Sequence, residues 1–236
     1  MSDRRYLFFD IECCDGNHIC EFGYVLIDDS FTIQDRDCIL INPDKKFNLT
    51  GRVGSKDIHL HFTEVEYFAS SIFPCFYTEI KTLIEAKNQT VIGHSIASDA
   101  AFLRTACKRY KLPSINFDFY DTQEIYTEYV NKSRTSLEGA VKAFNIEIPA
   151  FLHKSDDDAL MTMELLKAMC GALNVGIEEI LQSCPKAHGK TNNFVIQYGT
   201  HRPKKKNYCS PTTNKLGDFF KAQGIDISKI VDVEDA

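Results

Sequence analysis

The stretch YLFFDIECC, residues 6–14, has the composition of a buried strand but contains two acids, Asp10 and Glu12. Successive side chains of a strand point to opposite faces, so these two acids share one face while Phe9 and Ile11 point to the other. Two carboxylates on one buried face repel each other unless a cation lies between them or one is protonated. Oxygen ligands suit hard divalent cations such as Mg²⁺ and Mn²⁺, so the pattern indicates a metal site.

The composition bounds the class of protein. The chain has 236 residues, 44% of them hydrophobic and 25% charged, which is typical of a globular protein. We find no apolar run of about 18 residues and no signal peptide, and therefore expect a cytoplasmic protein that does not contact membranes. Nine cysteines without a CxxC pair favour reduced thiols, and the adjacent Cys13 and Cys14 lack the second ligand pair that zinc requires. The net charge of −6 argues against coating nucleic acid by charge alone.

The order of the expected elements predicts an α/β domain. Three consecutive strands should form a meander, within residues 5–14, 18–28 and 31–43. Short strands then alternate with helices: a helical region at 63–87 broken at Pro74, strands at 90–95 and 115–122, and helices at 98–112, 136–146 and 155–173. This order indicates a mixed five-stranded sheet, a meander followed by short parallel strands, with helices on both faces.

The character of the chain changes near residue 185. A basic segment without acids is followed by a short expected helix at 214–224 and an acidic end. We therefore predict one domain over residues 1–183 and a basic extension over 184–236. The cluster HRPKKKNY, residues 201–208, either holds a nucleic-acid strand away from the site or is a solvated tail.

Further acids lie at the starts of two expected helices. Asp99 follows the strand at 90–95, and Asp158 lies in the first turn of the helix at 155–173. Such acids are often structural, because the helix dipole favours them. Together with Asp10 and Glu12, however, they would complete a cage of four carboxylates. His153 precedes Asp158 by five residues and can act as a general base.

These segments resemble the three ordered motifs of the DEDDh family of 3′–5′ exonucleases, the group of DnaQ-like proofreading enzymes, ribonuclease T and oligoribonuclease. The matching segments are FDIE (9–12), GHSIASDAAFL (93–103) and LHKSDDDALMTMELL (152–166). The family positions fall on Asp10, Glu12, Asp99, His153 and Asp158. The resemblance covers roughly residues 5–183 and implies a ribonuclease H-like fold, four carboxylate metal ligands and a catalytic histidine.

The resemblance also implies an activity. It predicts two divalent cations, Mg²⁺ or Mn²⁺, and hydrolysis of single-stranded DNA or RNA from the 3′ end with release of nucleoside 5′-monophosphates. The alternatives are a non-catalytic nucleic-acid-binding module on the same fold and a structure-specific endonuclease. Some family members dimerise, so the resemblance leaves a homodimer open.

Candidate substrate contacts come from several segments. Eight residues are predicted to contact the nucleic acid: Cys13, Cys14, His18, Phe62, Ser95, Arg104, Lys132 and Arg134. The two cysteines stand where many family members carry Thr-Thr-Gly beside the terminal nucleotide, aromatic rings stack on unpaired bases, and cations contact phosphates. We interpret His94 as a strand-end residue bonded to backbone, and Asp156 and Asp157 as helix-start acids. His59 and His61 are interpreted as surface or groove residues.

Overall fold

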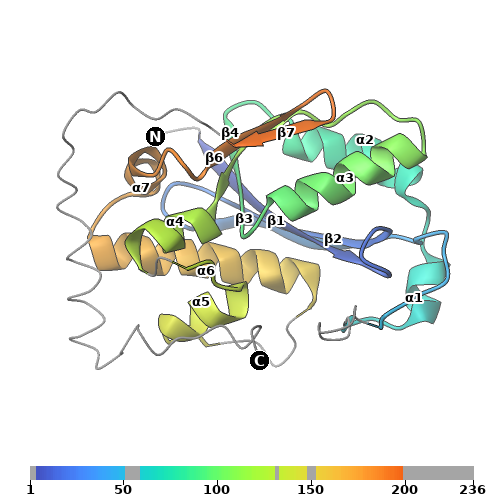
Figure 1. Cartoon of the computed structure of the whole chain (residues 1–236), viewed down its shortest axis with the longest axis horizontal. Coiled ribbons are helices and arrows are strands. Elements are labelled where there is room, and N and C mark those ends of the chain that lie inside the picture. Colours follow the sequence, from blue (N-terminus) through green and yellow to red (C-terminus); the bar gives the residue numbers. More distant parts are fainter. Residues whose placement is uncertain (1–3, 51–58, 131–132, 148–152, 199–236) are drawn as a thin grey trace.

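The computed structural model describes residues 4–50, 59–130, 133–147 and 153–198. It contains a seven-stranded sheet in the order β3-β2-β1-β4-β5-β6-β7, with helices packed on both faces (Figure 1). The strands are β1 (Arg5–Cys13), β2 (Ile19–Ile27), β3 (Ile33–Leu40), β4 (Gln89–Gly93), β5 (Phe117–Asp121), β6 (His188–Asn192) and β7 (Val195–Tyr198). The helices are α1 (Glu64–Ala69), α2 (Phe73–Ile84), α3 (Ala97–Arg109), α4 (Thr122–Tyr129), α5 (Leu137–Ala143), α6 (Ser155–Leu173) and α7 (Ile177–Ser183).

The α/β class and the mixed sheet are confirmed. Strands β1, β2 and β3 form the expected antiparallel meander, and β4 and β5 add in parallel beside β1. The break in the helical region lies at residues 70–72, between α1 and α2, and Pro74 follows it in the first turn of α2, where proline is tolerated. Ser136 caps α5, and its hydroxyl accepts a hydrogen bond from the Gly139 N–H.

The number of strands differs from the prediction. Residues expected to be irregular form the hairpin β6–β7, and β6 pairs antiparallel with β5. The sequence of β6, HGKTN, carries almost no apolar residue, so it gives no strand signal. Its Thr191 hydroxyl instead donates to the Ile115 carbonyl at 2.9 Å. Helices α4 and α7 were not among the expected elements either.

Two predictions concern residues outside the described ranges. The expected helix at 214–224 and the basic cluster at 201–208 lie outside the described residues. The boundary between residues 183 and 184 stays a prediction.

Within the described ranges no single helix is long and apolar enough to span a membrane. Only α6 and α7 together reach the required length and apolarity, and the pair is bent by 87°.

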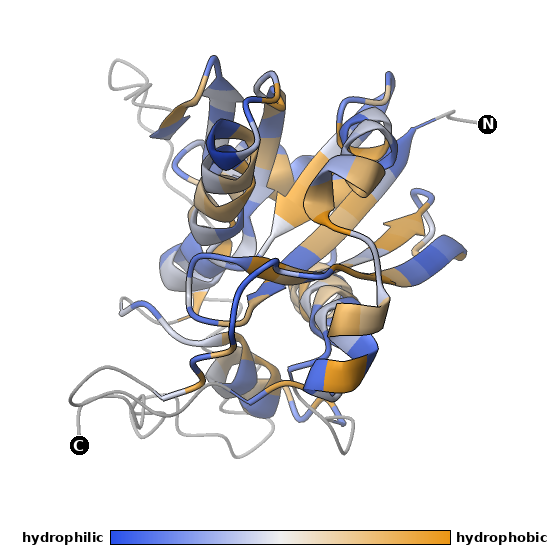
Figure 2. Ribbon diagram, turned by 90° about the vertical axis from the view of Figure 1, so that its right-hand side faces the viewer, coloured by the Kyte–Doolittle hydropathy of each residue, from blue (hydrophilic) through white to orange (hydrophobic). Residues whose placement is uncertain are grey.

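Two hydrophobic layers enclose the sheet. Tyr6 and Phe8 of β1 pack against α6, whereas Leu7 and Phe9 face the layer that contains α2 and α3. Figure 2 shows the hydrophobic residues concentrated along the central strands, between the helices. The alternation along β1 therefore assigns Asp10 and Glu12 to the α6 face, where they continue the row begun by Tyr6 and Phe8.

Strand β1 is longer than its parallel neighbour. Its pairing with β4 ends at Phe8 opposite Ile92, while its antiparallel pairing with β2 continues to Cys13. Beyond Phe8 the backbone of β1 is therefore open toward the start of α3. This geometry exposes a backbone N–H donor beside the two strand acids, and α3 supplies an acceptor for it.

Candidate metal centre and active site

The acid of α3 reaches β1 through the backbone. Asp99 lies in the first turn of α3, is buried, and accepts a hydrogen bond from the Ile11 N–H at 3.2 Å through Oδ1. Because Ile11 lies between Asp10 and Glu12, this bond places the Asp99 carboxylate beside both strand acids. The first two motifs predicted from the sequence therefore meet at one point.

Three consecutive aspartates begin α6, and only the third turns toward the site. Asp156 and Asp157 both accept from the Arg36 guanidinium of β3, Asp156 at 2.7 Å. Asp158 instead accepts from the His153 N–H. Its carboxylate, the Glu12 carboxylate and a ring nitrogen of His153 all lie within 4.8 Å of one another. The interpretation of Asp156 and Asp157 as structural acids agrees with these contacts.

His153 stands at the edge of the cluster. Its side chain is 53% exposed, and its Nδ1 lies 3.9 Å from Oε1 of Glu12. The residue has a positive φ of 77°, a backbone region that non-glycine residues enter rarely. This turn brings the imidazole beside Glu12, while Lys154 and α6 follow it in the chain. A histidine that is open to solvent and beside a carboxylate is suited to exchanging protons with water.

Burial and mutual repulsion disfavour the charged forms of these acids. Burial raises the pKa of Asp10, Glu12 and Asp99 well above their ordinary values, and neighbouring carboxylates raise it further for each. Burial likewise raises the pKa of Asp158 to about 7, although the His153 N–H opposes the shift. Within the described ranges no lysine or arginine lies at ion-pair distance from any of the four.

The donor set fits divalent metal ions. Carboxylate oxygens are hard ligands, and cations bound between them would remove the repulsion that now favours protonation. Asp10, Glu12, Asp99 and Asp158 would hold such ions. The five residues predicted from the sequence thus come together from β1, α3 and the segment that opens α6.

Two further carboxylates belong to this neighbourhood and were missed. Glu21 of β2 is fully buried and lies opposite Glu12 in the strand register. Asp121 caps α4, accepts from the Ser95 N–H at 2.8 Å and from the Tyr198 hydroxyl at 2.5 Å, and adds to the repulsion at Asp99. Glu21 is the one charged residue of ICEFGYVLI, residues 19–27, and that isolation was the signal available.

Two of the residues predicted to contact the substrate are buried in this structure. The side chains of Cys13 and Cys14 are 5% and 0% exposed and pack in hydrophobic clusters. Burial also raises the pKa of the Cys14 thiol to about 12. The alternation of β1 turns Cys13 away from the acid face, and the Asn48 N–H donates to the Cys14 carbonyl at 2.9 Å. Substrate contact by Cys13 and Cys14 stays a prediction, which the burial of both side chains disfavours.

The other predicted contacts have varied surroundings. His18 is paired with Asp15 at 2.8 Å, and Arg134 with Glu124 at 3.0 Å. Ser95 donates its N–H to Asp121, and Arg104 is half-buried on α3. Lys132 lies outside the described residues. Substrate contact by His18, Ser95, Arg104, Lys132 and Arg134 stays a prediction.

The surroundings of Phe62, His59 and His94 also differ. Phe62 is half-buried and packs edge-on against Tyr67, with the Lys154 ammonium 6.0 Å from its ring centre. His59 is exposed, and its ring centre lies 6.3 Å from that of His153, near the acids. His94 bonds through Nδ1 to Thr122 and through Nε2 to the Thr135 carbonyl, as expected of a structural histidine.

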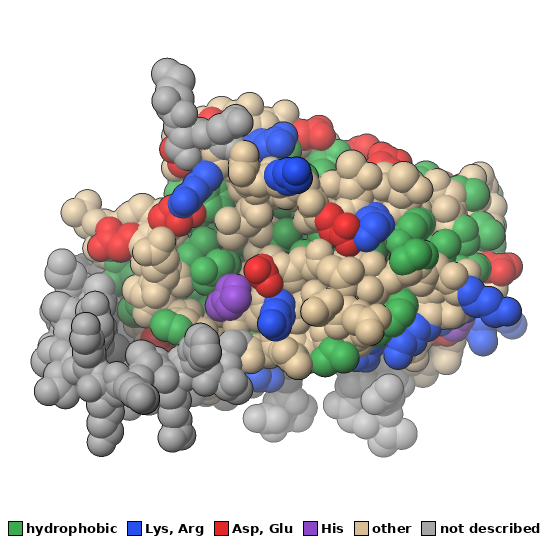
Figure 3. All heavy atoms as spheres, turned by 90° about the horizontal axis from the view of Figure 1, so that it is seen from above, with side chains coloured by type: hydrophobic (Ala, Val, Ile, Leu, Met, Phe, Trp, Pro, Cys, Tyr) green, Lys and Arg blue, Asp and Glu red, His purple; other side chains and the backbone are tan. Residues whose placement is uncertain are grey.

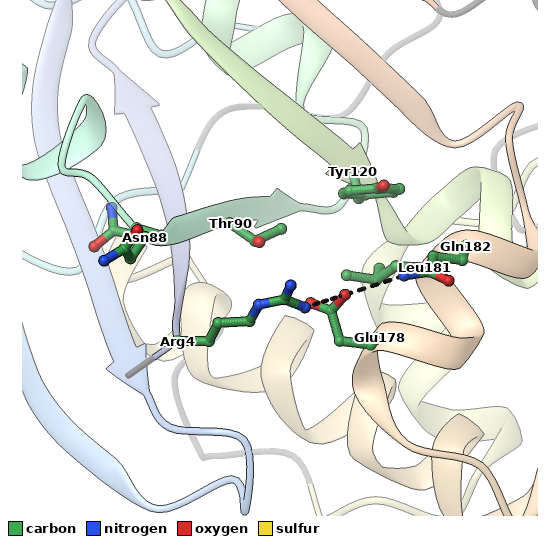
Figure 4. A pocket seen from close by; sticks show the side chains of 8 residues that line it. Arg4, Asn88, Thr90, Tyr120, Glu178, Leu181 and Gln182 are labelled. Atoms are coloured by element: carbon green, nitrogen blue, oxygen red, sulfur yellow. Dashed lines mark hydrogen bonds and ion pairs between the residues drawn. The ribbon is translucent and has the colours of Figure 1, made fainter. Parts of the chain in front are cut away.

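Elsewhere in the described part of the chain, charged side chains do not form a comparable cluster. On the face shown in Figure 3, acidic and basic side chains of the described residues are interspersed. A cavity of about 570 Å³ lies at the opposite end of β1, lined in part by Thr90, Tyr120 and Glu178 (Figure 4). Its one carboxylate, Glu178, already pairs with Arg4 and accepts from Tyr6 at 3.0 Å. It therefore lacks the uncompensated charge of the acid cluster.

Comparison with known proteins finds one matching family model. Residues 57–169 match the family model DEDDh_C, described as the C-terminal domain of DNA polymerase III subunit epsilon-like proteins. The matched range includes Asp99, His153 and Asp158, while Asp10 and Glu12 precede it. None of the curated proteins compared with the chain matches it.

Solved structures share the fold. A 3′-exonuclease described in its recognition of a histone mRNA stem-loop aligns with a TM-score of 0.63 and 13% identity, over 84% of this chain and 71% of the other. A full-length 3′-exonuclease aligns with a TM-score of 0.60 and 16% identity, over 84% and 67%. Escherichia coli exonuclease I in complex with a dA16 oligonucleotide aligns with a TM-score of 0.57 and 15% identity, over 72% and 41%. The chain thus spans less than half of the exonuclease I chain.

The seven-stranded sheet and the carboxylates grouped on it define an α/β domain of the ribonuclease H-like type. Over residues 57–169, just under half of the chain, the sequence is similar to the DEDDh exonuclease family, and the solved 3′-exonucleases and exonuclease I share the fold.

Proposed function

We propose that this protein is a divalent-metal-dependent 3′–5′ exonuclease that acts on single-stranded nucleic acid with a free 3′ end. One observation carries the proposal. Four carboxylates from three segments meet without a lysine or arginine partner in the described part of the chain, and a histidine lies beside them. Such a cluster is unfavourable alone and favourable with bound cations.

The residues have distinct tasks in this scheme. Asp10, Glu12, Asp99 and Asp158 would hold two divalent cations, which supply a nucleophile at neutral pH and neutralise the leaving 3′ oxygen. His153 takes the proton of the attacking water on its imidazole. Glu12 lies 3.9 Å from the His153 Nδ1 and stabilises the imidazolium that forms. The product is a nucleoside 5′-monophosphate.

The substrate class follows from the relatives only in outline. One structural relative is described with a histone mRNA stem-loop, and another in complex with a DNA oligonucleotide. We therefore propose single-stranded ends of either nucleic acid as substrate. The described residues of this chain favour neither sugar.

The test uses the full chain with Mn²⁺ and matched 5′-labelled DNA and RNA oligonucleotides. A ladder that shortens from the 3′ end, with mononucleotides as product and complete loss in EDTA, is expected. Circular single-stranded DNA serves as the control, because an exonuclease leaves it intact and an endonuclease cuts it. Binding without cleavage on every linear substrate would instead support a non-catalytic module.

A further inference from the structure

We propose that Glu21 is a positioning residue, which holds the start of α6 and thereby sets Asp158 and His153 against the acids of β1. The proposal rests on the function proposed above. Glu21 is not one of the expected metal ligands. Its place on β2 opposite Glu12, with 0% exposure, nevertheless puts a further buried carboxylate beside the cluster.

The Glu21 carboxylate is saturated with hydrogen bonds. Its Oε2 accepts from the Ser155 N–H and the Ser155 hydroxyl, each at 3.2 Å, and from the Cys38 thiol at 3.6 Å. Its Oε1 accepts from the Tyr67 hydroxyl of α1. These hydrogen bonds satisfy both oxygens of the buried carboxylate. It connects three elements, β3, α1 and α6, to one point on β2.

The contact with Ser155 replaces a helix cap. Ser155 is the first residue of α6, and the cap residue Lys154 makes no side-chain capping bond. The first N–H groups of a helix have no partner within the helix, and a negative charge is favourable there. Glu21 therefore supplies from the sheet an acceptor for the first N–H of α6, whereas the side chain of an ordinary cap accepts from the second or third.

Gly23 allows the start of α6 to approach β2 closely. It lies two residues after Glu21 on the same face of β2, and a Cβ there would fall 2.0 Å from the Asp156 nitrogen and 2.2 Å from the Ser155 carbonyl carbon. The backbone of α6 thus rests directly on β2. We call Glu21 and Gly23 the α6 seat.

The α6 seat is close in sequence to the reacting groups. His153 precedes Ser155 by two residues, and Asp158 follows it by three. Both therefore move with the Ser155 backbone, whereas Asp10 and Glu12 belong to β1. A shift of about 1 Å in such an arrangement can reduce turnover by roughly 100-fold without weakening substrate binding.

A purely structural role predicts something different. Loss of a buried hydrogen bond would then lower stability, and the molecules that remain folded would turn over at the normal rate. Positioning predicts a lower kcat per folded molecule and weaker Mn²⁺ binding, with KM for the oligonucleotide unchanged. The kcat per folded molecule and the Mn²⁺ affinity therefore distinguish a positioning role of Glu21 from a purely structural one.

The experiment compares Glu21→Ala with Glu21→Gln in the full chain, well below the unfolding temperature. The alanine variant should lose on the order of 100-fold in kcat, with KM within about twofold. The glutamine keeps an acceptor for Ser155 and should remain within about fivefold of the wild type, because the hydrogen bond and not the charge holds the helix. A glutamine variant as impaired as the alanine variant would overturn the proposal.

Two control variants measure the effect of lost stability alone. Thr191→Val removes a buried hydroxyl bond on β6, and Glu178→Ala removes a carboxylate that links α7 to β1 at the other end of the sheet. Both should keep the wild-type kcat. If Glu21→Ala behaves like these controls, Glu21 is merely structural and the proposal fails.

A further readout does not depend on catalysis. Amide hydrogen exchange at Ser155, followed by NMR, should speed up by tenfold or more in Glu21→Ala while residues 161–173 of α6 stay protected. Ser155→Ala, which removes only the hydroxyl, serves if Glu21→Ala does not fold, and should lower kcat by about threefold. Unchanged turnover and exchange in Ser155→Ala would contradict the proposal. A wild-type protein without nuclease activity would refute the proposed function but leave the exchange test of the α6 seat intact.

Discussion

The two ends of β1 carry carboxylates in opposite circumstances. At its start Glu178 meets Arg4 at 2.5 Å and the Gln182 amide at 3.3 Å (Figure 4). It also accepts from the Tyr6 hydroxyl at 3.0 Å. At its other end Asp10 and Glu12 meet chiefly other acids, and burial and repulsion raise their pKa values. A carboxylate with cationic and hydroxyl partners holds a fold together, whereas one among like charges needs a ligand.

The same contrast recurs within one turn of α6. Asp156 and Asp157 share the Arg36 guanidinium, and Asp156 also meets the Lys154 ammonium at 3.0 Å. Asp158, the next residue, points to Glu12 and His153. The partners of a side chain, more than its place in the sequence, therefore separate the structural acids from those proposed as metal ligands.

Substitutions at the two ends of β1 should differ most in their effect on turnover. Asp10→Asn removes one ligand and should reduce mononucleotide release by on the order of 10³-fold. The fold should survive, because the substitution also removes repulsion within the cluster. Glu178→Gln is the matched control and should keep normal turnover. An Asp10→Asn variant with wild-type activity, measured on a labelled oligonucleotide, would refute the assignment of the site.

Divalent cations should stabilise one end of β1 and not the other. Binding to the folded state at about 100 times the dissociation constant adds roughly 2.7 kcal/mol of stability. Mn²⁺ should therefore raise Tm in the wild type and in Glu178→Gln by a similar amount, and much less in Asp158→Asn. Differential scanning calorimetry measures this directly. An equal rise in all three proteins would locate the ion elsewhere.

Without metal the cluster should make stability depend on pH. The pKa of Asp158 rises from an ordinary value of 3.8 to about 7 in the folded state, so the folded protein binds this proton more tightly than the unfolded chain does. Stability from this group is therefore present at low pH and is lost as the pH rises from about 4 to 7. In EDTA the wild type should lose more stability than Asp158→Asn between pH 5 and pH 8, as measured by urea denaturation. Parallel losses would contradict the shifted pKa.

The sequence predicted the residues of the acid cluster better than it predicted the elements around them. Asp10 and Glu12 stand out because acids are rare in a buried strand, and Asp99 and Asp158 because they begin helices. Periodicity of two and of 3.6 residues also predicted the meander and the major helices. These signals are local, so one segment at a time suffices to find them.

The missing parts depend on contacts between distant segments. The hairpin β6–β7 has a polar sequence and is stabilised by pairing with β5 and by Thr191, none of which periodicity reveals. In the sequence Glu21 is a strand residue like its neighbours, and only its contacts with Ser155 of α6 and Tyr67 of α1 distinguish it. Cys13 and Cys14 were assigned to the substrate from the family pattern, but the alternation of β1 and the packing of the adjacent loop bury them.

The smallest expected effect concerns the paired aspartates. Arg36→Met removes the guanidinium from Asp156 and Asp157 but keeps most of the side-chain volume. The arginine is 28% exposed, so solvent screening limits the loss of stability to about 1 kcal/mol. Lys154 remains to pair with Asp156, and turnover should fall by less than about threefold because Glu21 still holds Ser155. A far larger loss of turnover, with Tm nearly unchanged, would mean that Arg36 and not the seat on β2 sets the position of Asp158.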